Sequence, residues 1–181
     1  MSSLTYNGGT HVLTLYDSNN REVGHWHANN NVAHTGATMT GVPNGVHQFL
    51  DRNSAHTHGG NADMANGSYG THGILRMTSM TANGTAHSGV GVHAGRANRH
   101  GADHPTHGCI RTTEEAMTAI TAHIGSDALT TMTVINNGNH GVGALNGAHA
   151  AHPRGHQQHT NHGHQRQHTA TPPIRFTHRL P

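Results

Sequence analysis

Large apolar side chains are scarce in this sequence, and their scarcity limits the folds that the chain can adopt. Leu, Ile, Val and Phe account for only 25 of the 181 residues. Such a level is typical of disordered chains when the net charge is high, whereas the formal charge here is only +2. Seven Met residues, all before residue 136, add apolar volume. We therefore expect one compact, mainly β domain with a thin core, followed by an appendage.

Short segments of alternating polarity predict the strands of this domain. Residues 10–28 predict a β-hairpin whose turn is the polar cluster Asp17–Asn20. A turn near Pro43 is expected to lead into a strand that ends at Phe49, and the polar residues 51–66 are expected to form a long loop. Three more strands are predicted at 73–77, 89–93 and 129–135.

One helix is predicted, and it is expected to begin just after residue 112. Thr112 as N-cap and Glu115 at the third helical position would form a capping box, and acidic residues suit the positive start of a helix. Gly125 is expected to end the helix. Four apolar residues fall on one face of it: Ala116, Met117, Ile120 and Ile124.

The C-terminal quarter of the chain has a different composition. Residues 137–181 hold four Arg, nine His and no acidic residue, and they show no periodicity. We therefore divide the chain into a domain at 1–136 and a basic, low-complexity tail at 137–181. Because histidine charges near a pKa of about 6.5, binding of polyanions by the tail should strengthen on mild acidification. Aromatic residues are absent between 137 and 175, so no nucleic-acid partner is expected.

The sequence carries no sign of a membrane segment, a metal centre or a cofactor. Its first eight residues have neither a basic nor a long apolar stretch, so we expect no cleaved signal peptide. No later run approaches the roughly 20 apolar residues that span a bilayer, so membrane insertion is not expected. His25 with His27 and His56 with His58 have the spacing of metal ligands, but no further ligands cluster near them.

Cys109 is the strongest chemical signal in the sequence. As the only cysteine, it cannot form an intramolecular disulfide. Gly108 would let the backbone approach a substrate, and His93 ends a predicted strand upstream. A nearby imidazole and a helix N-terminus both favour a nucleophilic thiolate, and N–H groups at Gly108 and Cys109 can form an oxyanion hole. Two other interpretations stay open: an inert buried thiol, and a Cys/His zinc site that includes His107.

Two segments around these residues resemble the signature of L,D-transpeptidases, the YkuD-type cell-wall enzymes. The segments are His93-Ala94-Gly95 and residues 106–111, Thr-His-Gly-Cys-Ile-Arg. The hairpin at 10–28 and the turn at Pro43-Asn44-Gly45 also stand where that family has such elements. The spacer between the two segments is slightly short for the family. That spacing is closer to the compact branch that resembles type VI secretion L,D-transpeptidase effectors.

The resemblance implies a YkuD-like β-sandwich with one principal helix flanking the catalytic groove. Cys109 would attack a peptidoglycan stem peptide to form a thioester, which an amine or water would then resolve. His93 would act as the base, and the carbonyl of Ala94 or Gly95 would orient its ring. The activity would be that of an L,D-transpeptidase with L,D-carboxypeptidase activity, without a cofactor.

The resemblance also implies which residues bind the substrate. Arg111 would bind a substrate carboxylate, because its planar fork matches that group, and His107 and Thr106 would line the pocket. For Arg111 a structural ion pair with Asp103 or Glu114 is an equal alternative. Action in the periplasm or cell wall would then require export from the cytoplasm by a specialised secretion system.

The partners expected beyond stem peptides are anionic cell-wall polymers, bound by the tail, and an immunity protein if the protein is a toxin. Two rival functions remain open at this point. One is a cysteine peptidase or amidase that cuts another cell-wall bond. The other is a non-catalytic, His-rich binding or assembly protein.

Overall fold

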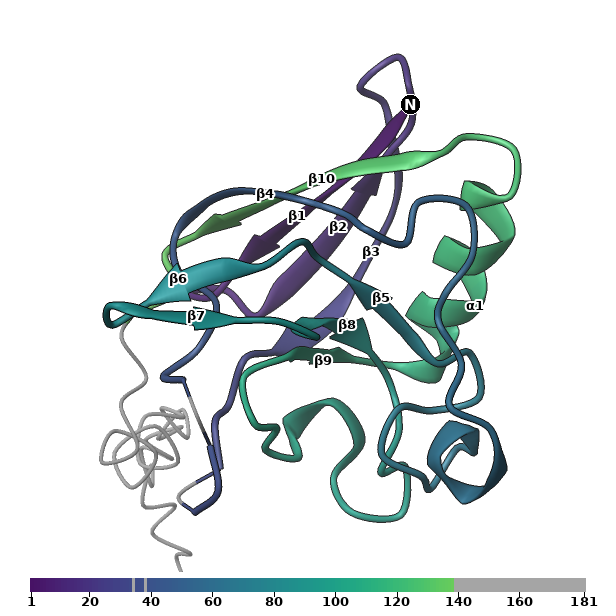
Figure 1. The fold of residues 1–181 in the computed structure, drawn as a ribbon. Helices are drawn as coiled ribbons and strands as arrows, with labels where there is room; N and C mark the ends of the chain where they lie inside the picture. The colour runs from purple at the N-terminus through teal and green to yellow at the C-terminus, as the bar shows by residue number, and fades with distance from the viewer. Residues whose placement is uncertain (34, 38, 139–181) are drawn as a thin grey trace, which may run out of the picture. The chain divides into compact units, whose positions relative to one another are not determined.

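The computed structural model describes residues 1–33, 35–37 and 39–138. Eight strands form one sheet in the order β4-β10-β1-β2-β3-β9-β8-β5, and a two-stranded hairpin, β6-β7, lies apart from it. In Figure 1 the sheet curls, so that β9, β8 and β5 lie below the fan of β1, β2, β3 and β10. The sheet strands are β1 (Ser2–Asn7), β2 (Val12–Tyr16), β3 (Glu22–Asn29), β4 (Gly45–Gln48), β5 (Ile74–Arg76), β8 (Gly91–His93), β9 (Ile110–Thr112) and β10 (Leu129–Ile135), and the hairpin strands are β6 (Met80–Ala82) and β7 (Thr85–His87).

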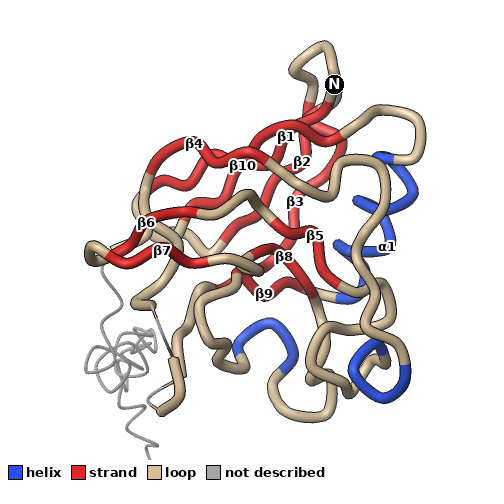
Figure 2. The backbone as a smooth tube through the Cα atoms, in the orientation of Figure 1, coloured by secondary structure: helices blue, strands red, loops and turns tan. Residues whose placement is uncertain are grey.

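The predicted strands are present, and the predicted hairpin at 10–28 is the antiparallel pair β2 and β3. Asp17 shapes its turn, because one side-chain oxygen accepts hydrogen bonds from the N–H groups of Asn19 and Arg21, both at 2.8 Å. Figure 2 shows how much of the chain between the strands is loop, including most of the predicted loop at 51–66, in which a short 3-10 helix spans Gly60–Asp63.

Three elements were not predicted: β1, β9 and the hairpin β6-β7. The alternation of β1 is visible in the sequence, since Ser2, Leu4 and Tyr6 point inward and are fully buried. Its partner β10 is parallel to it and more than a hundred residues away, so no local pattern could indicate the pairing.

The helix α1 (Glu114–Ile124) is the only α-helix among the described residues, and its predicted apolar face is buried completely in the core. The predicted N-cap was wrong. Thr112 is the last residue of β9, and its hydroxyl donates to the carbonyl of His27 at 2.9 Å. Thr113 caps the helix instead, accepting from the N–H of Ala116 at 3.1 Å. The helix therefore begins after a strand that separates it from Cys109.

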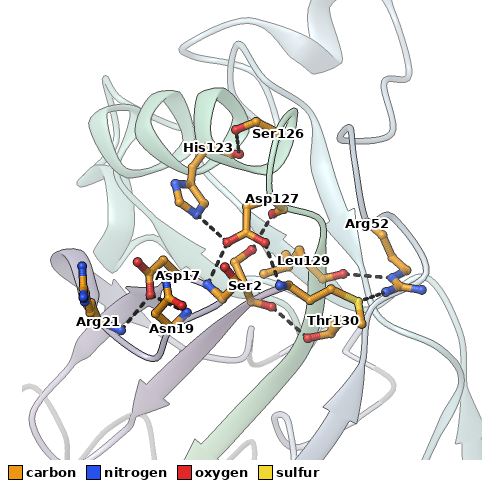
Figure 3. Close-up of polar contacts among 12 residues, drawn as sticks. Ser2, Asp17, Asn19, Arg21, Arg52, His123, Ser126, Asp127, Leu129 and Thr130 are labelled. Atoms are coloured by element: carbon orange, nitrogen blue, oxygen red, sulfur yellow. Dashed lines mark hydrogen bonds and ion pairs between the residues drawn. The ribbon is translucent and has the colours of Figure 1, made fainter.

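A charged cluster at Asp127 joins the start of the chain to the end of α1 (Figure 3). The Asp127 carboxylate lies 2.8 Å from the N-terminal ammonium and 3.4 Å from Nε2 of His123, and it accepts the N–H of Ser18 at 2.8 Å. The Ser2 hydroxyl donates to its backbone carbonyl. We call these contacts the Asp127 cluster. It ties β1, the β2-β3 hairpin and α1 together at one edge of the domain.

The described part of the chain ends just beyond β10. Asn137, which the sequence analysis placed in the tail, is buried and hydrogen-bonded within the domain. The rest of the predicted tail, residues 139–181, lies outside the described residues. None of the described helices has the length and apolar character needed to cross a lipid bilayer.

Candidate active site

A cavity of about 450 Å³ opens at the ends of β8 and β9. His93, Cys109 and Arg111 line it, together with Thr106 and His107. No acidic residue is among its lining residues. The remaining lining residues are Ala33, Ser68, Tyr69, Arg96, His104 and Pro105.

The pairing of β8 with β9 explains why these side chains meet. The two strands are parallel, with Val92 opposite Ile110 and His93 opposite Arg111. Side chains alternate along a strand, so extending this register by one residue places Cys109 on the same face as His93 and Arg111. Strand geometry then separates the Cα atoms of Cys109 and His93 by roughly 8 Å. Ile110, between Cys109 and Arg111, points into the core and is fully buried.

His93 is buried and fixed by one backbone carbonyl. Its Nδ1 lies 2.8 Å from the carbonyl oxygen of Ala94. A carbonyl only accepts hydrogen bonds, so Nδ1 carries the proton and the lone pair of Nε2 remains free. Burial, with the charge of Arg111, lowers the pKa of His93 to about 3, while the bond to Ala94 opposes that shift. The imidazole is therefore neutral at neutral pH. Of the two carbonyls expected to orient the ring, that of Ala94 makes the contact.

Cys109 is half-buried beside the cavity. Its thiol donates a long hydrogen bond, 3.9 Å, to the carbonyl of Gly89. No hydrogen bond joins Sγ to the His93 ring among the residues that the structure describes. Burial raises the pKa of the thiol, although the N–H of Gly91 and the charge of Arg111 act against that shift. The resting pair is therefore a neutral thiol and a neutral imidazole.

The helix N-terminus does not assist the sulfur, contrary to the sequence-based expectation. Three residues of β9 separate Cys109 from the cap Thr113, which in an extended chain places the two Cα atoms about 13 Å apart. The influence of a helix terminus falls off within about one turn. No residue of α1 lines the cavity, and Glu114, the first residue of the helix, accepts the N–H of Gly95 at 3.1 Å.

The loop that precedes Cys109 is closed by Thr106. The Thr106 hydroxyl accepts the N–H of Gly108 at 3.1 Å and donates to the carbonyl of Cys109 at 2.7 Å. The N–H of Gly108 is therefore already occupied, which removes one of the two oxyanion donors expected there. Gly108 itself has φ +139°, and a Cβ at this position would lie 2.5 Å from Cγ of Met39. Only glycine fits this backbone.

Arg111 is buried, with 4% of its surface exposed. Its Nη1 donates to the carbonyls of Ala94 at 2.9 Å and Ser68 at 3.2 Å. Its Nε is buried without a hydrogen-bond partner among the described residues. Burial and the neighbouring charge of Arg96 lower the pKa of Arg111 to about 10.

The alternative role of Arg111, an ion pair with Asp103 or Glu114, is wrong. Asp103 accepts instead from His27 and Asn29, and Glu114 binds Gly95 and Thr71. His107 is exposed at the cavity.

An aromatic wall of the cavity was not predicted from the sequence. The ring of Tyr69 lies edge-on to His93, with centroids 5.1 Å apart, and the ring of His58 stacks on Tyr69 at 4.0 Å. Gly95 makes room for the loop that carries Tyr69, because a Cβ on it would lie 2.5 Å from the carbonyl oxygen of Gly67. Tyr69 stands in an irregular segment without periodicity, so only its contacts identify it.

Arg96 and His104 also line the cavity without having been assigned to it. Within residues 1–33, 35–37 and 39–138, no group of three His, Cys, Asp or Glu side chains is arranged to hold a metal ion.

The described part of the chain is a mainly β domain with a curled sheet and a single α-helix, as in YkuD folds. Cys109, His93 and Arg111 line one cavity at two neighbouring parallel strands of that sheet. The sequence matches the YkuD family, described as the L,D-transpeptidase catalytic domain, over residues 4–135, so the chain belongs to that family. The matched residues correspond to the catalytic domain by which that family is described. No curated protein matches the sequence.

Solved structures that are similar to this one include the following three proteins. The helical cell shape determining protein Pgp2 from Campylobacter jejuni has a TM-score of 0.51 at 12% identity, and the match covers 74% of this chain and 46% of that chain. L,D-transpeptidase 1 from Mycobacterium tuberculosis has a TM-score of 0.45 at 15% identity, covering 74% and 61% of the two chains. L,D-transpeptidase (Yku) from Stackebrandtia nassauensis has a TM-score of 0.44 at 10% identity, covering 77% and 58%.

The similarity to Pgp2 shows that the two proteins share a fold, and nothing more. The present chain spans between 46% and 61% of the lengths of these three proteins.

Proposed function

We propose that this domain transfers the acyl group of a peptidoglycan stem peptide through a thioester on Cys109. One observation carries the proposal: Cys109, His93 and Arg111 project from one face of β8 and β9 into one cavity that no acidic residue lines. A nucleophile, a base and a cation for a substrate carboxylate thus face one space.

The neutral resting pair favours proton transfer in step with attack. The thiol proton passes to Nε2 of His93 while Sγ bonds to the carbonyl carbon of the substrate amide. The carbon–nitrogen bond then breaks, and the imidazolium returns the proton to the leaving amine. In the second step, an amine or water attacks the thioester, its proton passes through His93 to the sulfur, and the thiol is regenerated. The carbonyl of Ala94 stabilises the imidazolium formed in each step.

Arg111 is the candidate carboxylate ligand. Its Nε has no hydrogen-bond partner in the described part of the chain, and two carbonyls hold its Nη1 so that the guanidinium is fixed beside Cys109. Arg96, which donates to the Ser68 hydroxyl at 3.1 Å, adds a second positive charge at the cavity. Charge-assisted hydrogen bonds from a guanidinium to a carboxylate are strong, so two arginines at this wall suit the terminal carboxylate of a stem peptide.

Incubation of the protein with purified tetrapeptide muropeptides and a D-amino acid tests the proposal. Mass spectrometry should detect an acyl-enzyme that retains the stem peptide without its terminal D-Ala, and an exchanged product. Cys109→Ala should abolish both while leaving the melting temperature within a few degrees. Exchange at the normal rate by that variant would refute the role of Cys109. An acyl group from another cell-wall bond on Cys109 would refute the assignment and favour the rival peptidase or amidase.

The role of the tail and the route of export are separate proposals. The tail binds anionic cell-wall polymers when its histidines are protonated, and the protein is exported as an antibacterial effector with an immunity partner. Deleting residues 139–181 should weaken binding to such polymers most below pH 6.5 and leave turnover of soluble muropeptides unchanged. Equal binding at pH 5.5 with and without these residues would refute the proposed role of the tail.

A further inference from the structure

A single buried side chain, that of Asn30, holds the peptide backbone at the nucleophile. Asn30 directly follows β3 and is only 1% exposed. Its Nδ2 donates to the carbonyl of Gly108 at 2.8 Å and to the carbonyl of Cys109 at 2.9 Å. Asn30 does not line the cavity, so it holds this backbone from the side that faces the protein interior.

The orientation of the Asn30 amide is forced by its other partners. Oδ1 accepts the N–H of Val42 at 2.6 Å and Nδ2 of Asn137 at 2.8 Å. The backbone N–H of Asn30 donates to the hydroxyl of Tyr6 at 3.1 Å. A backbone N–H can only donate and a carbonyl can only accept, so the amide cannot be turned over without losing these bonds. We call these contacts the Asn30 network.

Because the peptide bond is planar, the hydrogen bond from Asn30 to the Gly108 carbonyl also fixes the direction of the Cys109 N–H. In a trans peptide the C=O and the following N–H point in opposite directions. Since Asn30 draws the carbonyl of Gly108 inward, the N–H of Cys109 points outward. Among the described residues nothing accepts a hydrogen bond from this N–H, whereas the N–H of Gly108 is bound to Thr106. The N–H of Cys109 is thus the donor that remains for a substrate oxygen.

We infer that Asn30 is a positioning residue for an oxyanion hole whose donor is the N–H of Cys109. The inference rests on the proposed function. When Sγ bonds to a carbonyl carbon, the electron pair of the C=O double bond moves to the oxygen, and a fixed N–H stabilises that charge. Loss of one such donor typically slows catalysis by about 10²–10³-fold. Without Asn30, the peptide between Gly108 and Cys109 can rotate, since the glycine permits other backbone conformations.

Two reactions of the same thiol test this role. Iodoacetamide alkylates Cys109 by displacing iodide, so no oxyanion forms, whereas p-nitrophenyl acetate acylates it through an oxyanion. For Asn30→Ala we expect acylation to slow by about 10–100-fold while alkylation changes by less than about threefold. Neither reagent depends on peptidoglycan, so the result stands apart from the test of the proposed function.

A matched control and a second variant make the experiment decisive. Asn29→Ala changes the neighbouring buried amide, which binds Asp103 and not the nucleophile loop, so both rates should stay within about twofold. Asn137→Ala removes one of the two donors that fix Oδ1 and should slow acylation by about three- to tenfold, leaving alkylation unchanged. The second variant decides the question if Asn30→Ala does not fold. An equal loss of both rates, or no loss of acylation, would overturn the inference.

Discussion

The Asn30 network and the Asp127 cluster both hold distant segments of the chain together, but they do so through different kinds of contact. Each joins segments more than a hundred residues apart, since Asn30 binds Asn137 and Asp127 binds the N-terminus. The Asn30 network is neutral and buried, whereas the Asp127 cluster is charged and lies at the edge of the domain.

The difference shows how the chemistry of a contact suits its place. Buried neutral hydrogen bonds do not titrate near neutral pH and keep their geometry, because leaving any partner unsatisfied is costly. Charged contacts in solvent are screened by salt and contribute little each. Buried neutral hydrogen bonds hold the backbone that presents the nucleophile Cys109.

Gly108→Ala should have the largest effect, because it alters the peptide that Asn30 holds. The new Cβ would meet Met39, and φ +139° is strained for alanine. We expect loss of muropeptide turnover by more than about 100-fold and a lower melting temperature. Adding Met39→Ala removes the clash but leaves the backbone strain, so it should not restore activity. Full recovery in the double variant would mean that sterics alone fix this loop.

Acid should destabilise the cavity before it reaches the Asp127 cluster. The pKa of His93 falls from 6.5 in the unfolded chain to about 3 in the folded domain, so between these values the unfolded chain binds the extra proton. Stability from this group is complete above pH 6.5 and declines toward pH 3, by up to roughly 5 kcal/mol.

Urea unfolding of the native protein and of His93→Gln across pH 7 to 4 measures this decline, and the variant should show a shallower slope. Asp127 behaves differently. Its N-terminal partner lowers its pKa below 3.8, so its contribution is lost only at more acidic pH, as the pH falls through that lowered value. Parallel slopes for the two proteins would contradict the buried neutral state of His93.

Tyr6→Phe tests a single bond of the Asn30 network. It leaves the buried N–H of Asn30 without its acceptor, so we expect a loss of roughly 1–2 kcal/mol in the free energy of unfolding. Acylation of Cys109 should fall only a few-fold, because the Asn30 side chain keeps its four hydrogen bonds. Burial raises the pKa of Tyr6 to about 12, so the loss should be constant between pH 6 and 9. Denaturant titrations at these pH values provide the measurement.

Asp127→Asn should have the smallest effect. It removes the charge that holds the N-terminal ammonium but retains an oxygen for the N–H of Ser18. We expect a slight fall in melting temperature that disappears in high salt, with muropeptide turnover unchanged. A large, salt-independent fall in melting temperature would show that the Asp127 cluster, like the Asn30 network, depends on buried contacts more than on exposed charges.

Parts of the fold and site could be predicted because their determinants are local. The alternation of β2, the apolar face of α1 and the Cys-Ile-Arg spacing each depend on neighbours within a few residues. The spacing is informative because residues two apart on a strand share a face. The start of α1 was misplaced by one residue because β9 takes Thr112 for its pairing with β3, which is a tertiary contact.

Other features have no local pattern. Asn30 reaches carbonyls 78 and 79 residues away, and nothing in the adjoining Asn29-Asn30-Asn31 distinguishes it from its neighbours. Tyr69 reaches His93 from an irregular loop. The pKa directions also depend on burial, which is why a depressed thiol pKa was expected and a raised one was found.

The sequence by itself determined which groups can react: one thiol, an imidazole at a strand end, and a guanidinium two residues beyond the thiol. Their chemistry belongs to the side chains, and strand periodicity orders them. Only the tertiary structure decided that both reacting groups rest neutral, that Arg111 stays free of acidic partners, and that Asn30 turns the peptide at Cys109. These properties arise from burial and from the direction of hydrogen bonds, which exist only once distant segments have packed together.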